Sequence, residues 1–324
     1  PESLCYVLFT SGTTGIPKGV TIKRGSLTQY LKIRRQQSPV TTEDRFIQTN
    51  DLSFDVAQEC LWRTLQDGAC LYEASLADRL SPAFFLSRHR ITQFIGVPSL
   101  LMQLRRQRSS DLHSVIDNLY GPTEATVSCM GFRIAPGEPV PEAANGQVPM
   151  GEPFADMSVR LVTTDGTQAP DGAPGELWLS GPQLSPGYLD SPEQNARAFV
   201  EKDGKRWYKT GDLVFRGAHG LVFAGRVDSQ IKLHGFRIEL EEVEAALRKI
   251  SGTTVLAGTV TDSHGNLRLV AALDEECPMD DAAILQACRK LLPDYMVPGE
   301  LRRVRNFPVN INGKLDRHAL FGSS

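Results

Sequence analysis

The chain has 324 residues, of which 41% are hydrophobic and 23% are charged, and this length and composition are those of a globular protein with room for two domains. Its formal net charge of −3 argues against a nucleic-acid or membrane surface, and no apolar run approaches the roughly 20 residues that a membrane-spanning helix needs. The six cysteines are scattered, without a CxxC pair or metal-ligand spacing, so we expect reduced core cysteines in a cytoplasmic protein.

The first strong pattern is an apolar stretch followed by a loop of small and hydroxyl residues. Residues 4–9 are apolar and β-prone, which predicts a buried strand. The next ten positions, 10–19, hold four hydroxyl residues, three glycines and one lysine. Glycines let backbone N–H groups approach an anion, hydroxyls donate hydrogen bonds to phosphate oxygens, and Lys18 adds a positive charge. This order predicts a polyphosphate site, although Pro17 stands before Lys18 where a Walker loop has glycine.

Residues 19–106 alternate between strand and helix patterns. Ser26 can cap a helix that runs to about Gln37, Ser81 with Pro82 marks the start of another, and a third runs through Arg106. The predicted strands are residues 19–22, 44–49, 68–72 and 91–99. This alternation predicts a parallel sheet covered by helices.

Asp55 interrupts an apolar run between the second and third of these strands. An aspartate at this place can cap the helix that follows, or its partly buried carboxylate can bind a cationic group. The residues alone leave both interpretations open.

A turn motif and an acid that follows a glycine come next. Gly-Pro turn chemistry explains Gly121 and Pro122 but not the Asn, Tyr, Thr and Glu residues around them. Strand patterns at 158–162 and 175–180 follow. Further on, Asp212 stands after a glycine beside a strand, where an acid is either a simple turn residue or accepts both ribose hydroxyls of a nucleotide.

The last hundred residues have the pattern of a small separate domain. They predict an amphipathic helix at 239–250, strands at 254–260 and 267–273, and a helix that ends before Pro293. Near the end, an Asn-Gly pair between β-prone flanks predicts a hairpin with Lys314 at its tip. A lysine at such a tip is ordinarily just solvated.

In this order the motifs resemble those of the adenylate-forming superfamily, and in particular the amino-acid adenylation domains of nonribosomal peptide synthetases. The resemblance covers residues 4–317 and rests on the segments 10–19, 118–124, 208–212, 225–240 and 312–317. It implies an α/β fold: a multi-layer large subdomain at 1–227, with a parallel sheet and a small β-barrel section, and a small α+β lid at 228–324 that turns about Asp228.

The resemblance assigns most of the motif residues to ATP. Catalytic roles fall to Lys314, Glu124, Thr13 and Lys18: Glu124 would ligate Mg²⁺, and Lys314 would bridge the substrate carboxylate and the α-phosphate. Tyr120 would stack on adenine, while Asn118 and Asp212 would bind its edge and the ribose. The full set expected at ATP is Thr10, Ser11, Gly12, Thr13, Thr14, Gly15, Lys18, Asn118, Tyr120, Gly121, Thr123, Asp212, Phe223, Arg226 and Lys232.

The resemblance also assigns a substrate pocket. Amino-acid-activating members hold the α-ammonium group with an acid at the position of Asp55, which acyl-CoA and aryl-CoA ligases generally lack. The positions that match side-chain contacts are Val56, Glu59, Ile95, Leu119, Val127 and Ser128. Glu59 favours a polar or cationic substrate side chain, although an acid there could instead point to solvent. The amino acid itself stays open.

The implied reaction converts an amino acid and ATP to aminoacyl-AMP and pyrophosphate, with Mg²⁺ as cofactor. The aminoacyl group would then pass to the phosphopantetheine thiol of a peptidyl carrier domain, and a neighbouring condensation domain is a further candidate partner. The alternatives are an acyl-CoA or aryl-CoA ligase, a D-alanine–carrier ligase, and a degenerate adenylation-like domain without catalysis.

Three features depart from the family pattern. The chain begins at Pro1, almost at the phosphate motif, so we expect a fragment without the family's N-terminal part. Between Arg108 and Asn118 the family has a further βα unit of about 30 residues, for which there is no room. Either this unit is deleted, which would damage the site, or the numbering closes over it. No carrier-domain serine motif follows Arg317, so the thioester acceptor is expected downstream or on a separate chain.

Overall fold

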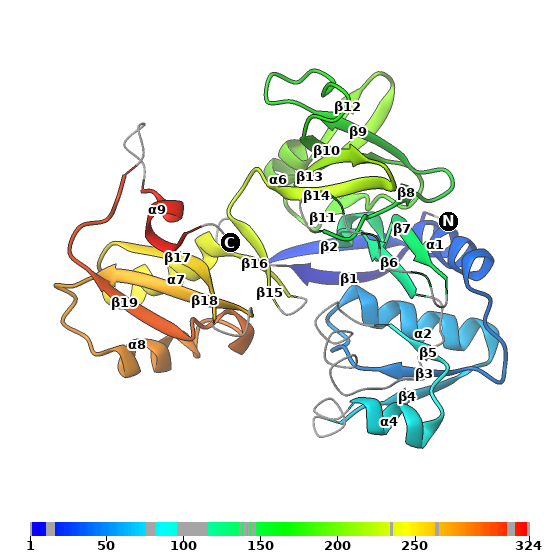
Figure 1. Ribbon diagram of the computed structural model, residues 1–324, viewed down its shortest axis with the longest axis horizontal. Helices are drawn as coiled ribbons and strands as arrows, with labels where there is room; N and C mark the ends of the chain where they lie inside the picture. Colours follow the sequence, from blue (N-terminus) through cyan, green and yellow to red (C-terminus); the bar gives the residue numbers. More distant parts are fainter. Residues whose placement is uncertain are drawn as a thin grey trace. The chain divides into compact units, whose positions relative to one another are not determined.

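The structure is a computed structural model (Figure 1), and the residues that it describes are 2–10, 17–75, 82–95, 116–135, 138, 141, 143, 147–233, 236–262, 266–309 and 315–322. The chain divides into two compact units. The first comprises Pro1–Phe9 and Gly19–Asp228, and the second comprises Thr10–Lys18 and Ser229–Ser324. Within the described part of the chain, no helix has the length and apolar character needed to cross a membrane.

The elements before Ser229 are strands in several small sheets, with helices packed between and around them. They are β1 (Leu4–Thr10), β2 (Lys18–Lys23), α1 (Arg24–Gln37), β3 (Arg45–Gln48), α2 (Asp55–Asp67), β4 (Cys70–Glu73), α4 (Pro82–His89), β5 (Gln93–Phe94), β6 (Ile116–Tyr120), η1 (Thr123–Ala125), β7 (Met130–Ile134), β8 (Glu152–Pro153), β9 (Ser158–Val162), β10 (Gly175–Ser180), β11 (Gly187–Tyr188), α6 (Pro192–Ala198), β12 (Phe199–Lys202), β13 (Lys205–Gly217) and β14 (Gly220–Arg226). Among the described residues, the sheet orders are β1-β2-β11, β4-β3-β5, β6-β7-β8 and β12-β13-β10-β9, with β14 paired to β13.

The predicted parallel layer is present. β3 pairs in parallel with both β4 and β5, and Figure 1 shows α2 and α4 on opposite sides of this sheet. Ile47 on β3 and Phe85 on α4 belong to a small core that joins the sheet to that helix. Because α2 follows β3, its first residue, Asp55, stands beyond the carboxyl end of a parallel strand, the edge at which ligands bind in such sheets.

The segment expected to hold a small β-barrel section forms an antiparallel five-stranded sheet. Its inward side chains, including Leu177, Leu179, Tyr208 and Leu221, are fully buried in the largest core of the first unit. The long strand β13 shifts register against β14 between Leu213 and Val214. Gly211 and Asp212, which directly precede the shift, therefore lie on a strand whose neighbouring residues Tyr208 and Val214 belong to that core.

The second unit is α+β, with its own core. Its elements are β15 (Gln230–Leu233), β16 (Phe236–Glu239), α7 (Leu240–Ser251), β17 (Val255–Thr261), β18 (Leu267–Asp274), α8 (Asp281–Cys288), η2 (Asp294–Met296), β19 (Glu300–Val304) and α9 (Arg317–Phe321). β18 and β19 are parallel and are joined through α8. Helix α7 begins with acids and ends with Arg248 and Lys249, as the helix dipole favours, and packs its apolar side against β17.

Two local predictions were wrong. Ser26 does not cap α1, because the helix already begins at Arg24, and the Ser26 hydroxyl instead donates to the Pro182 carbonyl at 2.9 Å. All six cysteines are free thiols, but the expectation of a core location fails for Cys70, which is exposed at the start of β4. In both cases the tertiary environment gives the residue a different role from the one that its local sequence favoured.

A buried ion network joins helices α1 and α2. Glu59 Oε1 lies 3.0 Å from Arg34 Nε and 3.3 Å from Arg63 Nη1, and all three side chains are at least 96% buried. Arg34 also reaches Asp117 on β6 at 3.4 Å. Burial would raise the pKa of Asp117, but its hydrogen bond from Arg133 and the charge of Arg34 outweigh burial, so that pKa is lowered. The network therefore favours the ionised form of Asp117.

We expect Glu59→Gln to lower the unfolding free energy of the first unit by about 3–5 kcal/mol, because it leaves two buried guanidinium groups without their shared carboxylate. Denaturant unfolding followed by tryptophan fluorescence measures this, since the chain's three tryptophans, Trp62, Trp178 and Trp207, all lie in the first unit.

The matched control is Glu152→Gln, which removes an exposed partner of Arg216 at 3.4 Å and should cost about 0–1 kcal/mol. Equal, small losses in both variants would contradict a structural role for the Glu59 network.

Candidate nucleotide and substrate site

The site is built around the connection between β6 and β7. The Cys129 amide donates to the Tyr120 carbonyl at 2.9 Å, so the chain returns to its starting point within nine residues. A Cβ atom on Gly121 would lie 2.4 Å from Ser128 Cα and 2.6 Å from the Val127 carbonyl oxygen. Glycine is thus the residue that allows this turn to close.

The far side of the same connection is strained and firmly held. Thr126 and Val127 have φ angles of 58° and 68°, a left-handed conformation that is unfavourable for β-branched residues. The Thr126 hydroxyl donates to the Gln183 carbonyl at 2.6 Å, and Gln183 Nε2 donates back to the Ala125 and Ser128 carbonyls at 3.2 and 2.7 Å. These bonds stabilise a backbone that the local sequence would not adopt by itself.

Glu124 is fully buried at the centre of this connection. Its Oε1 accepts a hydrogen bond from the Tyr188 hydroxyl at 2.7 Å, and its carbonyl accepts from the Ser185 amide at 2.7 Å. Within the described residues, no group of three or more His, Cys, Asp and Glu side chains could hold a metal ion. One oriented carboxylate that shares the ion with nucleotide phosphates is a donor set typical of Mg²⁺, so Glu124 fits the predicted ligand chemistry.

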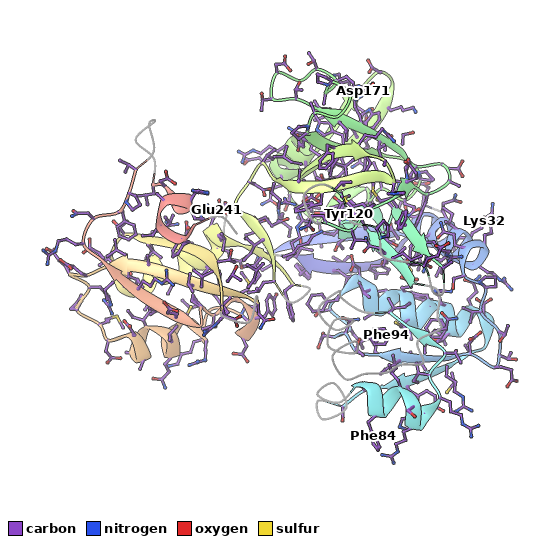
Figure 2. All side chains as sticks on the ribbon, in the orientation of Figure 1. Lys32, Phe84, Phe94, Tyr120, Asp171 and Glu241 are labelled. Carbon is purple, nitrogen blue, oxygen red and sulfur yellow. The ribbon has the colours of Figure 1, made fainter. Side chains whose placement is uncertain are left out.

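Tyr120 and Asp212 meet across two sheets. The Tyr120 hydroxyl donates to Asp212 Oδ2, and Figure 2 shows Tyr120 deep within the first unit. Burial and then the Asp212 charge raise the pKa of Tyr120 well above its ordinary value, so the phenol stays protonated. Asp212 Oδ1 pairs with Arg226 on β14, and Arg226 also binds Asp228. The structure therefore brings together three predicted ATP residues and the residue predicted as the pivot.

Asn118, on β6, donates its Nδ2 to the Pro149 carbonyl at 2.8 Å. This bond fixes the side-chain amide two positions before Tyr120, on the same side of the strand. Its predicted contact with adenine stays a prediction.

Asp55 joins this group from the start of α2. The Thr123 hydroxyl donates to Asp55 Oδ2 at 2.7 Å, although 68 positions separate the two residues. Phe54 is the N-cap of α2 and Asp55 its first residue, so Asp55 does not cap the helix through its side chain. The Tyr6 hydroxyl on β1 is buried with no hydrogen-bond partner among the described residues, and burial and then Asp55 raise its pKa.

Of the predicted phosphate loop, the structure describes the two ends, which are Thr10 and residues 17–19. Thr10 ends β1, and its buried hydroxyl has no hydrogen-bond partner within the described parts of the chain, which fits a donor that meets a phosphate oxygen. Lys18 belongs to the second unit, and its Nζ lies 3.7 Å from Glu239 Oε1. The predicted residues that lie outside the described ones are Ser11, Gly12, Thr13, Thr14, Gly15 and Lys314.

The predicted pocket residues differ in what surrounds them. Ser128 is buried and donates to the Tyr30 hydroxyl at 3.2 Å, next to the strained Val127. Glu59 is held between Arg34 and Arg63, so its carboxylate is already neutralised inside the protein. The remaining predicted residues are half-buried or exposed: Val56, Ile95, Leu119 and Phe223 are half-buried, and Lys232 is exposed on β15.

Sequence reasoning missed Tyr188 and Gln183 as supports of the site. Both follow the predicted strand at 175–180, and their partners are more than 50 positions away. No local signal distinguishes them. The nearest hint is Gly187, whose φ of 141° places the following Tyr188 on β11.

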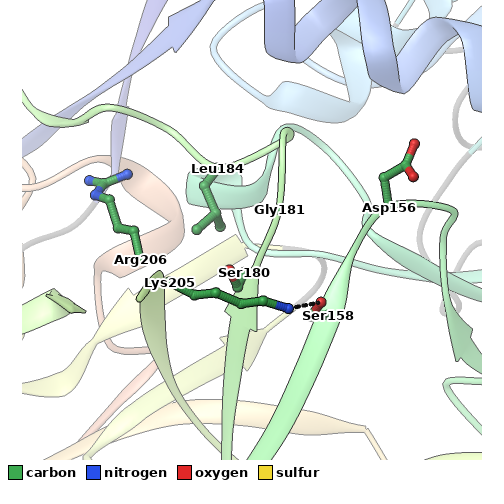
Figure 3. Close-up of a pocket in the computed structure, with 7 residues that line it drawn as sticks. All are labelled: Asp156, Ser158, Ser180, Gly181, Leu184, Lys205 and Arg206. Carbon is green, nitrogen blue, oxygen red and sulfur yellow. Dashed lines mark hydrogen bonds between the residues drawn. The ribbon is translucent and has the colours of Figure 1, made fainter. Parts of the chain in front are cut away.

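A separate cavity of about 400 Å³ opens beside β9, β10 and β13 (Figure 3). Lys205 crosses it toward Ser158, with 3.4 Å between Nζ and Oγ. Its lining residues are Asp156, Ser158, Ser180, Gly181, Leu184, Lys205 and Arg206, and none of them belongs to the predicted site.

Comparison with known proteins supports the motifs. The profile of a family described as "AMP-binding enzyme" matches residues 1–117 and 110–189, and its two segments overlap where the sequence lacks room for a βα unit. Malpinin synthetase of Mortierella alpina is 32% identical over 368 residues, which cover 98% of this chain and 5% of that protein. Zwittermicin A synthase ZmaJ of Bacillus cereus is 31% identical over 365 residues, covering 100% of this chain and 69% of that protein.

Among solved structures, the adenylation domain AlmE of Vibrio cholerae, in complex with glycyl-adenosine-5′-phosphate, has a TM-score of 0.88 at 28% identity. The match covers 98% of this chain and 66% of that one. The chain therefore belongs to the AMP-binding enzyme family, the adenylate-forming superfamily that its motifs indicate, and the predicted fold class is confirmed. It spans between 5% and 69% of the two curated relatives.

We expect Gly121→Ala to lower the unfolding free energy of the first unit by about 1–3 kcal/mol, because the new methyl group would overlap backbone atoms that cannot rotate away. Tryptophan fluorescence during denaturant unfolding measures this loss. An unchanged midpoint would contradict the close backbone approach between Gly121 and Ser128.

Proposed function

We propose that this chain activates an amino acid with ATP, giving an aminoacyl adenylate and pyrophosphate. The aminoacyl group then passes to the phosphopantetheine thiol of a peptidyl carrier domain. The observation that carries the proposal is the 2.7 Å hydrogen bond between Thr123 and Asp55. It ties an acid suited to an α-ammonium group to the motif whose neighbours Tyr120 and Glu124 are suited to a nucleotide and its metal ion.

The proposed roles follow from charge and hydrogen bonding. Asp55 would accept hydrogen bonds from the ammonium group, while its bond from Thr123 keeps the carboxylate oriented. Asp212 would accept the ribose hydroxyls, because each carboxylate oxygen can accept more than one hydrogen bond and one lone pair on each is already used by Tyr120 or Arg226. Val127 and Ser128 would line the side-chain pocket. Glu59 is omitted from that pocket, because Arg34 and Arg63 already neutralise it.

In the reaction, an oxygen of the substrate carboxylate attacks the α-phosphorus of ATP. The bond from the α-phosphorus to the bridging oxygen breaks, and pyrophosphate leaves with the electron pair. The protein contributes positioning and positive charge to such a step, because phosphoryl-type transfer needs little covalent help. Thr10 and Lys18 would hold the outgoing phosphates, and Lys314 would hold the carboxylate and α-phosphate together. Glu124 would hold Mg²⁺, which supplies charge neutralisation at the phosphates when bound.

The division of the chain into two units is compatible with the proposed second half-reaction. After adenylation, the C-terminal residues 229–324 would rotate about Asp228 and withdraw Lys314 from the adenylate. The thiol sulfur of the phosphopantetheine arm then attacks the acyl carbon, and AMP leaves. A carrier domain would supply this arm, and a neighbouring condensation domain is a further proposed partner.

The test is ATP–pyrophosphate exchange by the full-length protein across proteinogenic and common nonproteinogenic amino acids. We expect exchange with one amino acid or a few similar ones. Lys314→Ala should lower the rate by about 10²–10³-fold, the loss typical of one well-placed charged donor. Lys290→Ala removes an exposed lysine of the same unit and should leave exchange unchanged.

Asp55→Asn separates the proposal from a CoA ligase. The unaltered protein should prefer an amino acid over its deamino analogue, and the variant should lose most of that preference, because the amide carries no charge to pair with ammonium. Exchange with deamino acids alone, together with thioester formation on CoA, would favour the ligase alternative. Nucleotide binding without exchange by any acid would sink the catalytic proposal and leave a binding domain.

A further inference from the structure

Arg226 stands between two acids that the proposed function treats separately. Its Nε and Nη2 donate to the two oxygens of Asp228 at 2.6 and 2.7 Å, which is a bidentate pair. Its Nη1 donates to Asp212 Oδ1, and Nη2 also donates to the Thr210 carbonyl at 3.1 Å. All three guanidinium nitrogens are therefore used, and the Arg226 side chain is only 8% exposed.

The backbone is shaped to hold this arrangement. Asp212 and Arg226 are directly paired across β13 and β14, and the Val227 amide donates to the Gly211 carbonyl at 2.9 Å. Gly211 has a φ of 74°, and a Cβ atom there would lie 2.7 Å from Arg226 Nη2 and 2.8 Å from Asp228 Oδ2. The guanidinium group and the Asp228 carboxylate occupy the space that any larger residue at position 211 would need.

The charges also make the three side chains interdependent. One guanidinium serves two carboxylates, and Asp212 is nearly fully buried whereas Asp228 is 37% exposed. Loss of the Asp228 charge would leave fewer acceptor sites for the Arg226 Nε and Nη2 groups and would break the charged bidentate pair. Because the planar Arg226 guanidinium group is bonded to a carboxylate on each side, its orientation is fixed. A lysine ammonium group at the same place would act as a point charge.

We propose that Arg226 is a positioning residue for Asp212, and that Asp228 acts on nucleotide affinity through Arg226 without touching the nucleotide. The inference rests on the proposed function, in which Asp212 accepts the ribose hydroxyls. It differs from the predicted role of Arg226, a direct contact with ATP. By linkage, a nucleotide on Asp212 must in turn stabilise the backbone at Asp228, the residue proposed as the pivot.

The first experiment measures AMP binding by calorimetry, without an amino acid, for the unaltered protein and three variants: Asp228→Asn, Arg226→Lys and the double variant. Asp228→Asn keeps the shape of the side chain and should weaken AMP binding about fivefold or more. In the Arg226→Lys background the same change should weaken AMP binding by less than about twofold, because the coupling through the guanidinium group is already lost. Asp171→Asn removes an exposed charge elsewhere in the first unit and should leave AMP binding unchanged.

The second measurement follows the Val227 amide by hydrogen exchange, because its bond to the Gly211 carbonyl reports on the backbone beside Asp228. AMP should slow this exchange in the unaltered protein and should have little effect in Arg226→Lys. A change that merely destabilises the fold would instead accelerate exchange with and without AMP to the same degree.

The outcomes separate the two proposals. If AMP does not bind to the unaltered protein, the proposed nucleotide site falls, and this inference falls with it. If AMP binds but Asp228→Asn binds it within twofold of the unaltered protein, the inference alone is overturned. It is overturned equally if Asp228→Asn has its full effect in the Arg226→Lys background, since the coupling then does not pass through Arg226.

Discussion

The site depends on one tight connection, the return of the chain from Tyr120 to Cys129. Four of its side chains reach four different elements: Tyr120 reaches Asp212 on β13, Thr123 reaches Asp55 on α2, Glu124 reaches Tyr188 on β11, and Ser128 reaches Tyr30 on α1. The connection can do this because Gly121 lets two backbone segments touch and because Gln183 stabilises the left-handed residues behind it. Strain concentrated at one short segment is typical of a functional site, and here it fixes the directions of several polar groups at once.

Much of this organisation could be predicted from local sequence. The strands of the parallel layer, the turn at Gly121 and the helix α7 all have patterns whose physical basis is local: apolar alternation, turn chemistry and helix amphipathicity. The relation between Asp55 and the motif at 118–124 could not be obtained in this way, because it depends on a contact across 68 positions. It was accessible through the order of motifs, which identifies a fold in which those positions meet.

Ser26 and Glu59, two polar residues whose predicted roles the structure changes, each have a partner on another element. Ser26 has the local character of a helix cap, but a carbonyl from the 182–184 segment offers its hydroxyl a better partner than the helix end does. Glu59 has the spacing of a pocket residue, and its two arginines come from α1 and from the next turn of its own helix. Burial of an acid can be predicted from the sequence. Which cation neutralises that acid is harder to predict, because the cation can come from any neighbouring element.

Glu59 and Asp212 show how the same chemistry can serve opposite purposes. Both are buried carboxylates bonded to arginine, but the surroundings differ in charge. Around Glu59 the guanidinium groups of Arg34 and Arg63 outnumber the acid they share, so no negative charge is left for a ligand. Around Asp212 the proportion is reversed, since Arg226 divides its charge between two carboxylates and Tyr120 contributes a neutral hydroxyl. The second cluster therefore keeps negative charge that favours hydrogen-bond donors such as ribose hydroxyls, and the first cluster keeps two helices together.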